Sequence, residues 1–363
     1  MRHLRKRALA LCLCFVFGIF LTSCGDSSVQ PPTGNTDTSV EAGTSASTVS
    51  QSSSESETED PVADLVMAHN TITGVFGVYD MALLEPGDFL EEGLVWSCKT
   101  GEGGDMKYRE GTVFGDVIVT CGSGIGKMIS YPEGKVLWET KNPGNNPHAI
   151  EILPSGNIVI ACSTGNILRL FKTSALLQGE SATAISFLDV ELRDAHGVLY
   201  DPSYEVVWAL GGSELAAFSI QGDGTEQTLS RVGGMGVTLP SKYAGGHDLS
   251  ADFTSKEHLY LTTNAKVFRF DKENNELIER FPQYAKLSKS AVKGFSNNPN
   301  GNFFYSRVNK GIGTSWEKET FAAWCTDRIC FCYMKTKNLM YVQEYVSRNG
   351  AFYKIRAFCG SYQ

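Results

Sequence analysis

Three of the six histidines in this chain occupy the same place in a repeated phrase. His148 opens HAIEILPSG, His196 opens HGVLYDPSY and His247 opens HDLSADFTS. The same alignment puts Lys293 of KGFSNNPNG in this column, and a second match, between DVIVTCGSG and NIVIACSTG, puts Lys107 level with His148. Successive members of this His/Lys column are 41, 48, 51 and 46 residues apart.

A ring of imidazole and ammonium groups favours an anionic guest, because such donors form charge-assisted hydrogen bonds with carboxylate, sulfate or phosphate oxygens. Either Lys354 or Arg356 would complete the ring. Polar neighbours of the column add hydrogen-bonding capacity, and they are Asn145, Asn146, Asp194, Asp248, Lys289 and Ser290. We therefore predict a ligand site formed by Lys107, His148, His196, His247, Lys293, Asp248, Asp194 and Asn146.

Two other interpretations of the column remain open. His148, His196 and His247 would form a three-histidine zinc or manganese site with an open coordination position, oriented by Asp194 and Asp248, although flanking lysines would repel the ion. Alternatively, a histidine at the start of a strand bonds the backbone of the neighbouring repeat and has a purely structural role.

The elements that position the column are short strands. Residues 147–152, 158–162 and 167–171 are apolar or alternating runs rich in β-branched side chains, and Gly, Asn and Pro separate them. This pattern predicts an antiparallel meander, which buries too little apolar surface to be stable alone. Recurrence every 41 to 51 residues is typical of four-stranded propeller blades. The sequence predicts an all-β, single β-propeller of six blades, with five or seven as alternatives.

The chain ends should meet in one blade. The first blade, which opens at residues 65–67, lacks an innermost strand, and the C-terminal residues 351–358 are able to supply it. The innermost strands of a propeller line its central channel, so the column should face that channel. Blade six carries an insertion at residues 309–321.

The first 60 residues resemble an export and anchoring segment. Four basic residues precede an apolar run at 8–20 that is too short to span a membrane comfortably. The run ends in LTSC, which looks like a bacterial lipobox, so we expect residues 1–23 to be a lipoprotein signal peptide and Cys24 to be lipidated. Residues 24–60 are rich in Ser, Thr and Glu, which predicts a disordered tether before a propeller domain at 61–363.

Charge and cysteine content narrow the function classes. The signal peptide holds four of the 32 basic residues and no acid, so the net charge falls from −8 to 28 − 40 = −12 after its removal. That acidity argues against nucleic-acid binding. Seven cysteines follow Cys24, an odd number that leaves at least one free thiol outside the cytoplasm. Cys121 and Cys162 lie in apolar strands and are predicted to be core residues.

The repeated phrases also carry a resemblance. NNPHAIEILPSGNIVIACSTGNILRLF, DAHGVLYDPSYEVVWALGG, GGHDLSADFTSKEHLYLTTNAKVFRFD and the closing FYKIRAF resemble a family of secreted bacterial propellers known only as a domain of unknown function. The resemblance spans nearly all of residues 64–358 and implies a fold but no activity. The channel histidines are distantly similar to those of aryl-sulfate sulfotransferase and oligogalacturonate lyase propellers, whose full motif sets are absent from this sequence.

These observations predict a monomeric lipoprotein on the outer face of the bacterial cell membrane that binds an anionic small molecule or carbohydrate. Tyr108, Trp316 and Trp324 are candidate stacking partners for sugar rings. One alternative is an enzyme acting on anionic substrates, a uronate lyase or a sulfuryl transferase, with a histidine as general base or nucleophile. Another is a protein-interaction scaffold.

Overall fold

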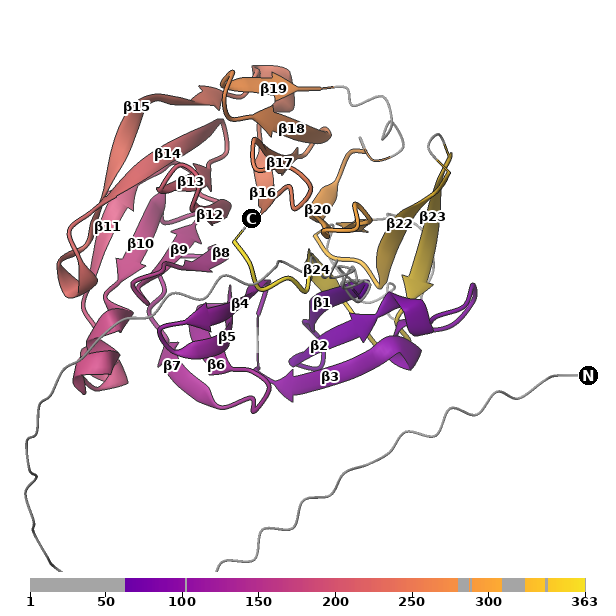
Figure 1. The fold of residues 1–363 in the computed structure, drawn as a ribbon, viewed down its shortest axis with the longest axis horizontal. Helices are drawn as coiled ribbons and strands as arrows, with labels where there is room; N and C mark the ends of the chain where they lie inside the picture. The colour runs from indigo at the N-terminus through magenta and orange to yellow at the C-terminus, as the bar shows by residue number, and fades with distance from the viewer. Residues whose placement is uncertain are drawn as a thin grey trace, which may run out of the picture. The chain divides into compact units, whose positions relative to one another are not determined.

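The computed structural model describes residues 63–101, 103–279, 287, 289–308, 324–336 and 339–362. Within these residues, the strands form six four-stranded antiparallel sheets arranged as blades around a centre (Figure 1). The predicted six-bladed all-β propeller is confirmed. The signal peptide, Cys24 and the tether lie outside the described residues, as do Trp316 and the predicted insertion at 309–321.

Blades one to three are built from strands that follow one another in the chain, except for the innermost strand of blade one. From the centre outward, blade one is β24 (Phe352–Ala357), β1 (Leu65–Asn70), β2 (Val75–Asp80) and β3 (Leu94–Lys99). Blade two is β4 (Asp105–Thr112), β5 (Gly115–Gly122), β6 (Ile125–Ser130) and β7 (Val136–Thr140). Blade three is β8 (Pro147–Ile152), β9 (Ile158–Cys162), β10 (Ile167–Phe171) and β11 (Phe187–Glu191).

Blades four to six repeat the same order. Blade four is β12 (Gly197–Asp201), β13 (Val206–Leu210), β14 (Glu214–Gln221) and β15 (Thr228–Thr238). Blade five is β16 (Gly246–Ala251), β17 (His258–Thr263), β18 (Val267–Asp271) and β19 (Glu276–Ile278). Blade six is β20 (Val292–Asn297), β21 (Phe303–Arg307), β22 (Arg328–Thr336) and β23 (Leu339–Val346).

The helices of the described residues are short 3-10 turns in the connections. They are η1 (Met81–Leu83), η2 (Leu90–Gly93), η3 (Thr173–Gln178), η4 (Ala182–Ala184), η5 (Gly224–Glu226) and η6 (Ser241–Tyr243). No helix in the described part of the chain has the length and apolar character needed to cross a membrane.

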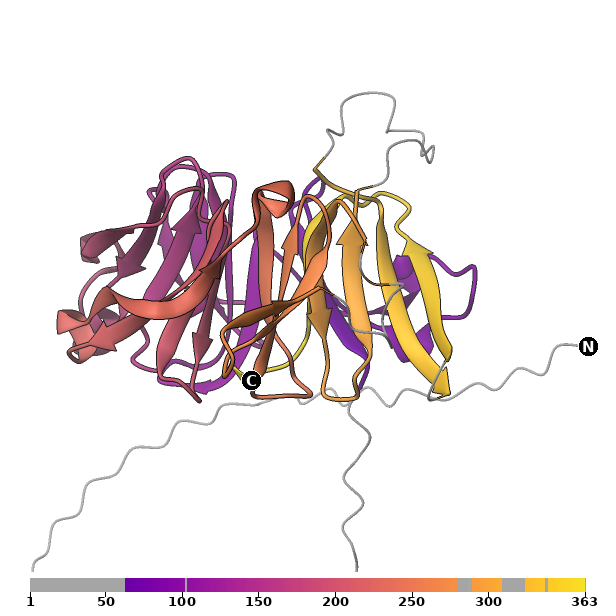
Figure 2. The ribbon, with the colours of Figure 1, turned by 90° about the horizontal axis from the view of Figure 1, so that it is seen from above.

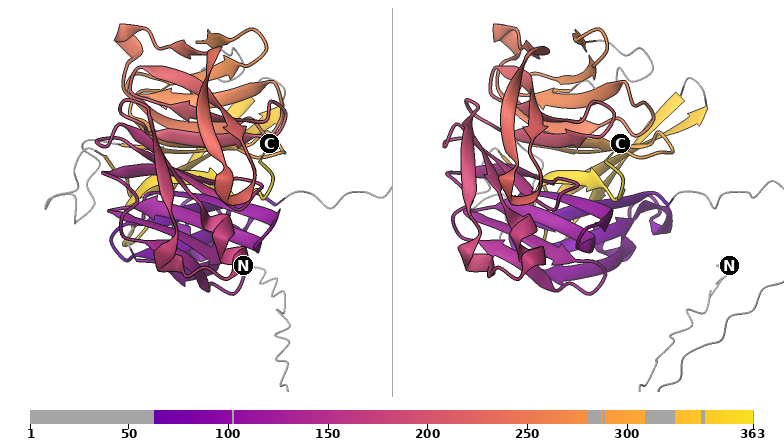
Figure 3. Two further views of the ribbon diagram at one scale, coloured as in Figure 1. Left: turned by 90° about the vertical axis from the view of Figure 1, so that its left-hand side faces the viewer. Right: turned by 60° about the vertical axis from the view of Figure 1, so that its left-hand side comes forward.

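The C-terminal strand closes the ring, as predicted. β24 pairs antiparallel with β1, with Met67 opposite Arg356 and Ala68 opposite Ile355. The yellow C-terminal strand therefore lies beside the indigo start of the propeller in Figures 1 and 3. Seen edge-on in Figure 2, the chain leaves β24 and ends on one face of the ring.

The hydrophobic core consists of six clusters, each between two neighbouring blades. In β9, Ile158, Ile160 and Cys162 pack toward blade two, whereas Val159 and Ala161 pack toward blade four. Because successive side chains of a strand point to opposite faces, a strand sandwiched between two blades must be apolar at every position. This explains the uninterrupted run IVIAC, whose residues are all buried.

The cysteines of the described residues are all free thiols. Cys121 and Cys162 are buried in the core between blades two and three, which confirms their predicted place. Burial raises the pKa of the Cys162 thiol to about 12 and that of Cys121 well above its usual value. Both are therefore small apolar core residues, chemically unreactive at neutral pH.

Candidate functional site

The innermost strands of blades three to six all start at one rim of the channel, with a column residue at the same place. In blades three, five and six a register shift makes His148, His247 and Lys293 the extra residue at the strand start. A bulge of this kind turns a side chain away from the regular pleat. In blade four, His196 immediately precedes β12, and the backbone N–H of His196 donates to the carbonyl of Leu210 at 2.8 Å. These four column residues therefore point into one space.

That space is a cavity of about 440 Å³ at the strand-start face. Besides the four column residues, it is lined by Thr71, Gly103, Gly104, Gly122, Ser123, Asn146, Pro147, Trp324 and Tyr353. Its volume is within the range of small-molecule sites. Glycine is required beside the cavity, because a Cβ on Gly294, which follows Lys293, would lie 2.5 Å from the backbone nitrogen of Ile355.

The three imidazoles form a contiguous row. The rings of His148 and His196 stack with centroids 4.2 Å apart and planes 22° apart, and His247 meets His196 edge-on at 5.4 Å. Tyr353 of β24 contacts His148, and Trp324 in turn contacts Tyr353. The wall of the cavity is thus a continuous aromatic surface drawn from blades three, four, five, six and one.

Hydrogen bonds orient two of the histidines. His196 Nδ1 donates to the backbone carbonyl of Asp194 at 2.9 Å, with the Asp194 carboxylate 3.3 Å away, which leaves Nε2 as an acceptor. His247 Nε2 lies 2.8 Å from Lys293 Nζ and 2.6 Å from Asn264 Oδ1. In the Nδ1–H tautomer this nitrogen accepts from the Lys293 ammonium, and in the Nε2–H tautomer it donates to the Asn264 oxygen. The buried Nδ1 of His247 has no hydrogen-bond partner among the described residues. Within the described residues the His148 ring contacts the rings of His196 and Tyr353 and makes no side-chain hydrogen bond, so its nitrogens are available to a ligand.

Burial makes the imidazoles neutral at physiological pH. Desolvation, aided by His196 and Lys354, lowers the pKa of His148 to about 2. Desolvation, aided by Lys293, lowers the pKa of His247 to about 4, and desolvation also lowers that of His196. Burial and the nearby Lys354 lower the pKa of Lys293 to about 8, so its ammonium is still mostly protonated at pH 7. Lys293 is therefore the only cation among the described residues that line the cavity.

Lys107 does not share the position of His148, and the sequence alignment was wrong on this point. Lys107 is paired with Val119, whose counterpart in blade three is Ile160, the partner of Ile150. Seven residues separate the paired Arg109 and Val117 in blade two, because β4 has a register shift before its hairpin, whereas five separate the paired Ile152 and Ile158 in blade three. The two extra residues alone offset a count along the chain, so that Lys107 is level with Ile150 and not with His148, and only strand pairing reveals this.

Lys107 instead belongs to a buried ionic network in the channel, beneath the cavity. Its Nζ donates to the carbonyl of Ile150 at 2.5 Å and to Asp105 at 3.1 Å. Arg356 donates to Asp105 at 2.6 Å and to both oxygens of Asp248 at 2.6 Å, and Lys354 lies 3.2 Å from Asp248.

All five residues of this channel network are at most 4% exposed. Burial alone would raise the pKa of Asp105, but Arg356, Lys107 and Lys354 outweigh it and hold that pKa well below its usual range. Asp248, predicted as a ligand-binding residue, thus bonds protein cations and the Phe295 N–H instead of lining the cavity. The network joins blades one, two and five.

Of the other residues predicted for the site, some line the cavity and others lie elsewhere. Asn146 lines the cavity, and its amide donates to Ser163 at 2.9 Å. Asp194 supports His196 from behind. Trp324 lines the cavity, whereas Tyr108 stacks on Phe358 in the core between blades one and two. Of the linker residues, Ser290 accepts a hydrogen bond from Arg307 and Lys289 lies over the Tyr305 ring.

Sequence reasoning missed Tyr353, Asp105 and Asn264. Tyr353 lines the cavity, whereas Lys354, one of the two residues expected to complete the ring, is the next residue along β24 and points into the channel network. A shift of one residue in the strand therefore separates the two. Asp105 carries no repeat signal, because none of its counterparts by strand pairing is acidic; they are Pro147, Gly197, Gly246 and Val292. Asn264 lies in the β17–β18 turn, where an asparagine is unremarkable from sequence.

The rings of the histidine row do not converge on one point. Stacked imidazoles direct their nitrogens side by side, whereas zinc requires ligands arranged around a common centre. Within the described residues, no three His, Cys, Asp or Glu side chains form a group able to hold a metal ion. The zinc or manganese site stays a prediction for elemental analysis to test.

Comparison with known proteins adds a family and a fold. The model of the "Family of unknown function (DUF6528)" matches residues 113–319, more than half of the chain. None of the curated proteins matches. A solved structure, that of a protein of unknown function from Bacteroides caccae, is 13% identical, with a TM-score of 0.51 over 81% of this chain and 98% of its own. At that identity the likeness supports the propeller fold alone. This chain is a β-propeller of unknown function and belongs to the DUF6528 family.

Proposed function

We propose that this protein is a binding module that captures an anionic small molecule or glycan at the strand-start cavity. The observation that carries the proposal is the placement of Lys293, a buried ammonium in a cavity whose other described lining residues are neutral. A carboxylate or sulfate would accept hydrogen bonds from Lys293 Nζ, which has three donors and uses one on His247.

The rest of the cavity supports a ligand larger than a bare anion. The nitrogens of His148 and the buried Nδ1 of His247 have no partner within the described residues and would bond hydroxyl groups. Trp324 is 41% exposed at the rim, where its ring would stack on the apolar face of a sugar. We therefore favour an acidic sugar, whose carboxylate would meet Lys293 and whose ring would meet Trp324.

Isothermal titration calorimetry with trigalacturonate, and with maltotriose as the uncharged counterpart, tests this proposal. We expect Lys293→Met to weaken trigalacturonate binding at least about tenfold, because one charge-assisted hydrogen bond contributes about 1.5–3 kcal/mol. Lys256→Met is the matched control, because Lys256 is exposed in the β16–β17 turn at the other end of β16 from His247. Equal losses in the two variants, or equal affinity for the two sugars, would contradict the proposal.

A second candidate function is catalysis on the same class of ligand. The observation that favours it is the 2.8 Å contact between His247 Nε2 and Nζ of Lys293, whose pKa burial lowers to about 8. A neutral imidazole or amine there would be a suitable general base for the proton next to a uronate carboxylate. Appearance of an unsaturated, ultraviolet-absorbing uronate on incubation with trigalacturonate, lost in His247→Gln, would establish a lyase.

We also propose that the propeller is held at the outer face of the cell membrane by lipid on Cys24. The basic, apolar and LTSC segments of residues 2–24 support this. Metabolic labelling with a palmitate analogue should mark the wild-type chain in the membrane fraction, and Cys24→Ser should abolish the label. A labelled Cys24→Ser chain would refute the anchor.

A further inference from the structure

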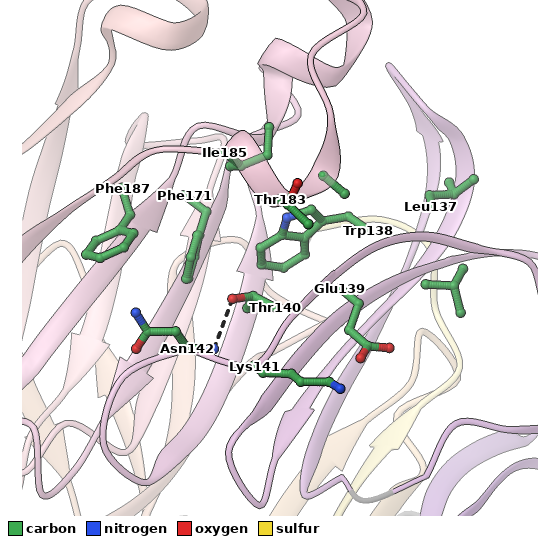
Figure 4. Close-up of a pocket in the computed structure, with 12 residues that line it drawn as sticks. Leu137, Trp138, Glu139, Thr140, Lys141, Asn142, Phe171, Thr183, Ile185 and Phe187 are labelled. Carbon is green, nitrogen blue, oxygen red and sulfur yellow. Dashed lines mark hydrogen bonds between the residues drawn. The ribbon is translucent and has the colours of Figure 1, made fainter.

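A second, larger cavity lies at the outer edge of the propeller, far along the blades from the channel. It has a volume of about 690 Å³ and is formed between β7 of blade two and the connection and outer strand of blade three (Figure 4). Every residue of β7 lines it, together with Lys141 and Asn142. The opposite wall consists of Ala182, Thr183, Ile185 and Phe187, with Phe171 between the walls.

The wall from blade three is an elaboration that blade two lacks. The β10–β11 connection covers residues 172–186 and holds η3 and η4, whereas the β6–β7 connection covers only residues 131–135. Hydrogen bonds fix the start of this connection to blade three, from Thr173 Oγ1 to the carbonyl of Gly156 at 2.5 Å and from the Ser174 N–H to Asn157 Oδ1 at 3.0 Å. At its other end β11 pairs with β10, with Phe187 opposite Phe171. The cavity is therefore preformed.

Its floor is aromatic. Trp138 and Phe171 meet edge-on with centroids 4.9 Å apart and are almost fully buried. Phe187 contacts Phe171 at 5.5 Å and is 41% exposed, with the Arg169 guanidinium 3.9 Å above its ring. This surface suits an apolar ring.

One polar group in the floor lacks a partner. Trp138 is 1% exposed, and its indole N–H has no hydrogen-bond acceptor among the described residues. Figure 4 shows the indole nitrogen on the side of the ring that faces Thr183, within the cavity. Two other indoles offer an internal comparison, because Trp96 donates to the carbonyl of Pro132 at 2.9 Å and Trp208 donates to Asp201 at 3.0 Å. Since buried donors are normally satisfied, the Trp138 N–H calls for an acceptor from outside the chain.

The charges around the cavity favour an uncharged ligand. Glu139 lies on the cavity wall and pairs with Lys127 at 3.1 Å, and the exposed Lys141 also lines the cavity, so charges of both signs flank it and a ligand of neither sign is favoured. From these features we infer that the cavity between blades two and three binds a small uncharged molecule with an apolar ring and a carbonyl-type acceptor, which receives the Trp138 N–H. This site is separate from the anion site and does not rest on it.

Acetophenone is the probe, since it combines a phenyl ring with one carbonyl, and ethylbenzene is its counterpart of similar size without the oxygen. The full-length chain, labelled with 15N in the indole ring, has five tryptophans, and the spectrum of Trp138→Phe identifies the Trp138 signal. Acetophenone should shift the Trp138 indole proton downfield with saturation on the order of 1–10 mM, as expected of a nine-atom ligand. Ethylbenzene should bind at least about fivefold more weakly, because it accepts no hydrogen bond.

Matched variants locate the effect. Phe187→Ala should weaken acetophenone binding at least about threefold by removing apolar contact. Phe89→Ala is the matched control and should leave acetophenone binding unchanged. Phe89 belongs to another blade, but its ring is similarly exposed and also lies under a guanidinium, that of Arg348 at 4.1 Å. The inference is overturned if the Trp138 signal of the wild-type chain does not respond to acetophenone. It is also overturned if that signal responds equally to ethylbenzene.

Discussion

The channel network offers a quantitative test of what holds the ring closed. It contains three cations, Lys107, Lys354 and Arg356, and two carboxylates, Asp105 and Asp248, which gives a formal charge of +1 in a buried space. Arg356→Met would leave two carboxylates with one lysine each. Asp248→Asn would leave three cations around Asp105 alone. Although Arg356 makes more hydrogen bonds, the second change creates the larger charge imbalance.

The magnitudes follow from that imbalance. Breaking a buried ion pair by removing one partner costs about 3–5 kcal/mol. We expect Arg356→Met to lower the free energy of unfolding by about 3 kcal/mol, the lower end, because the remaining charges balance and methionine fills the space. Asp248→Asn should cost about 5 kcal/mol, the upper end. The double variant restores the charge of +1, so its cost should be at least about 1 kcal/mol below the sum of the two single costs.

Urea denaturation followed by tryptophan fluorescence provides the measurement. Arg348→Met is the control, because Arg348 pairs with Glu92 at the surface, where both side chains are more than 40% exposed, and its loss should cost at most about 1 kcal/mol. The reasoning is refuted if Arg356→Met is more destabilising than Asp248→Asn. Strict additivity in the double variant would also refute it, because that would mean that the two groups do not interact.

Three further results are expected. Burial lowers the pKa of Lys293 to about 8, so the affinity for trigalacturonate measured by calorimetry should be constant below that pH. Above it, the affinity should fall about tenfold per pH unit as the ammonium loses its proton. A flat profile would exclude Lys293 as the binding cation. Burial holds the folded pKa values of His148 and His247 at about 2 and about 4, below the usual 6.5. Only the unfolded chain therefore takes up protons there between pH 6.5 and 4, and the free energy of unfolding should decrease as the pH falls through that interval, less steeply in a His148→Gln, His247→Gln variant. Elemental analysis should find zinc and manganese far below one ion per chain, because the stacked rings of His148 and His196 share no centre; stoichiometric metal lost in a His148→Ala, His196→Ala variant would prove the opposite.

Much of the architecture can be predicted from the sequence because a propeller is built from local, repeated units. Runs such as 158–162 are apolar at every position since both faces of the strand are covered, and glycine and asparagine turns separate them. Antiparallel neighbours joined by short hairpins need no long-range information. The closing strand at 352–357 was also predictable, because the first blade lacked one strand and the chain end held an unassigned one.

The candidate site was predictable only in part. His148, His196, His247 and Lys293 recur at one place of the repeat, so their convergence follows from the ring itself. Lys107 was misplaced because the hairpin of blade two holds two more residues than that of blade three, and only backbone pairing reveals this offset.

The tertiary structure alone decides how deeply each side chain of the channel is buried and whether it carries a charge. Formal charges along the sequence suggest a ring of cations, whereas burial neutralises the imidazoles and the carboxylates of Asp105 and Asp248 pair with three of the cations. The protonation state of a group depends on its distance from water and from other charges, and these distances come from six blades meeting at one axis. The strand order of this protein is therefore determined by local sequence, and the chemistry of its cavity by which side chains the closed ring removes from water.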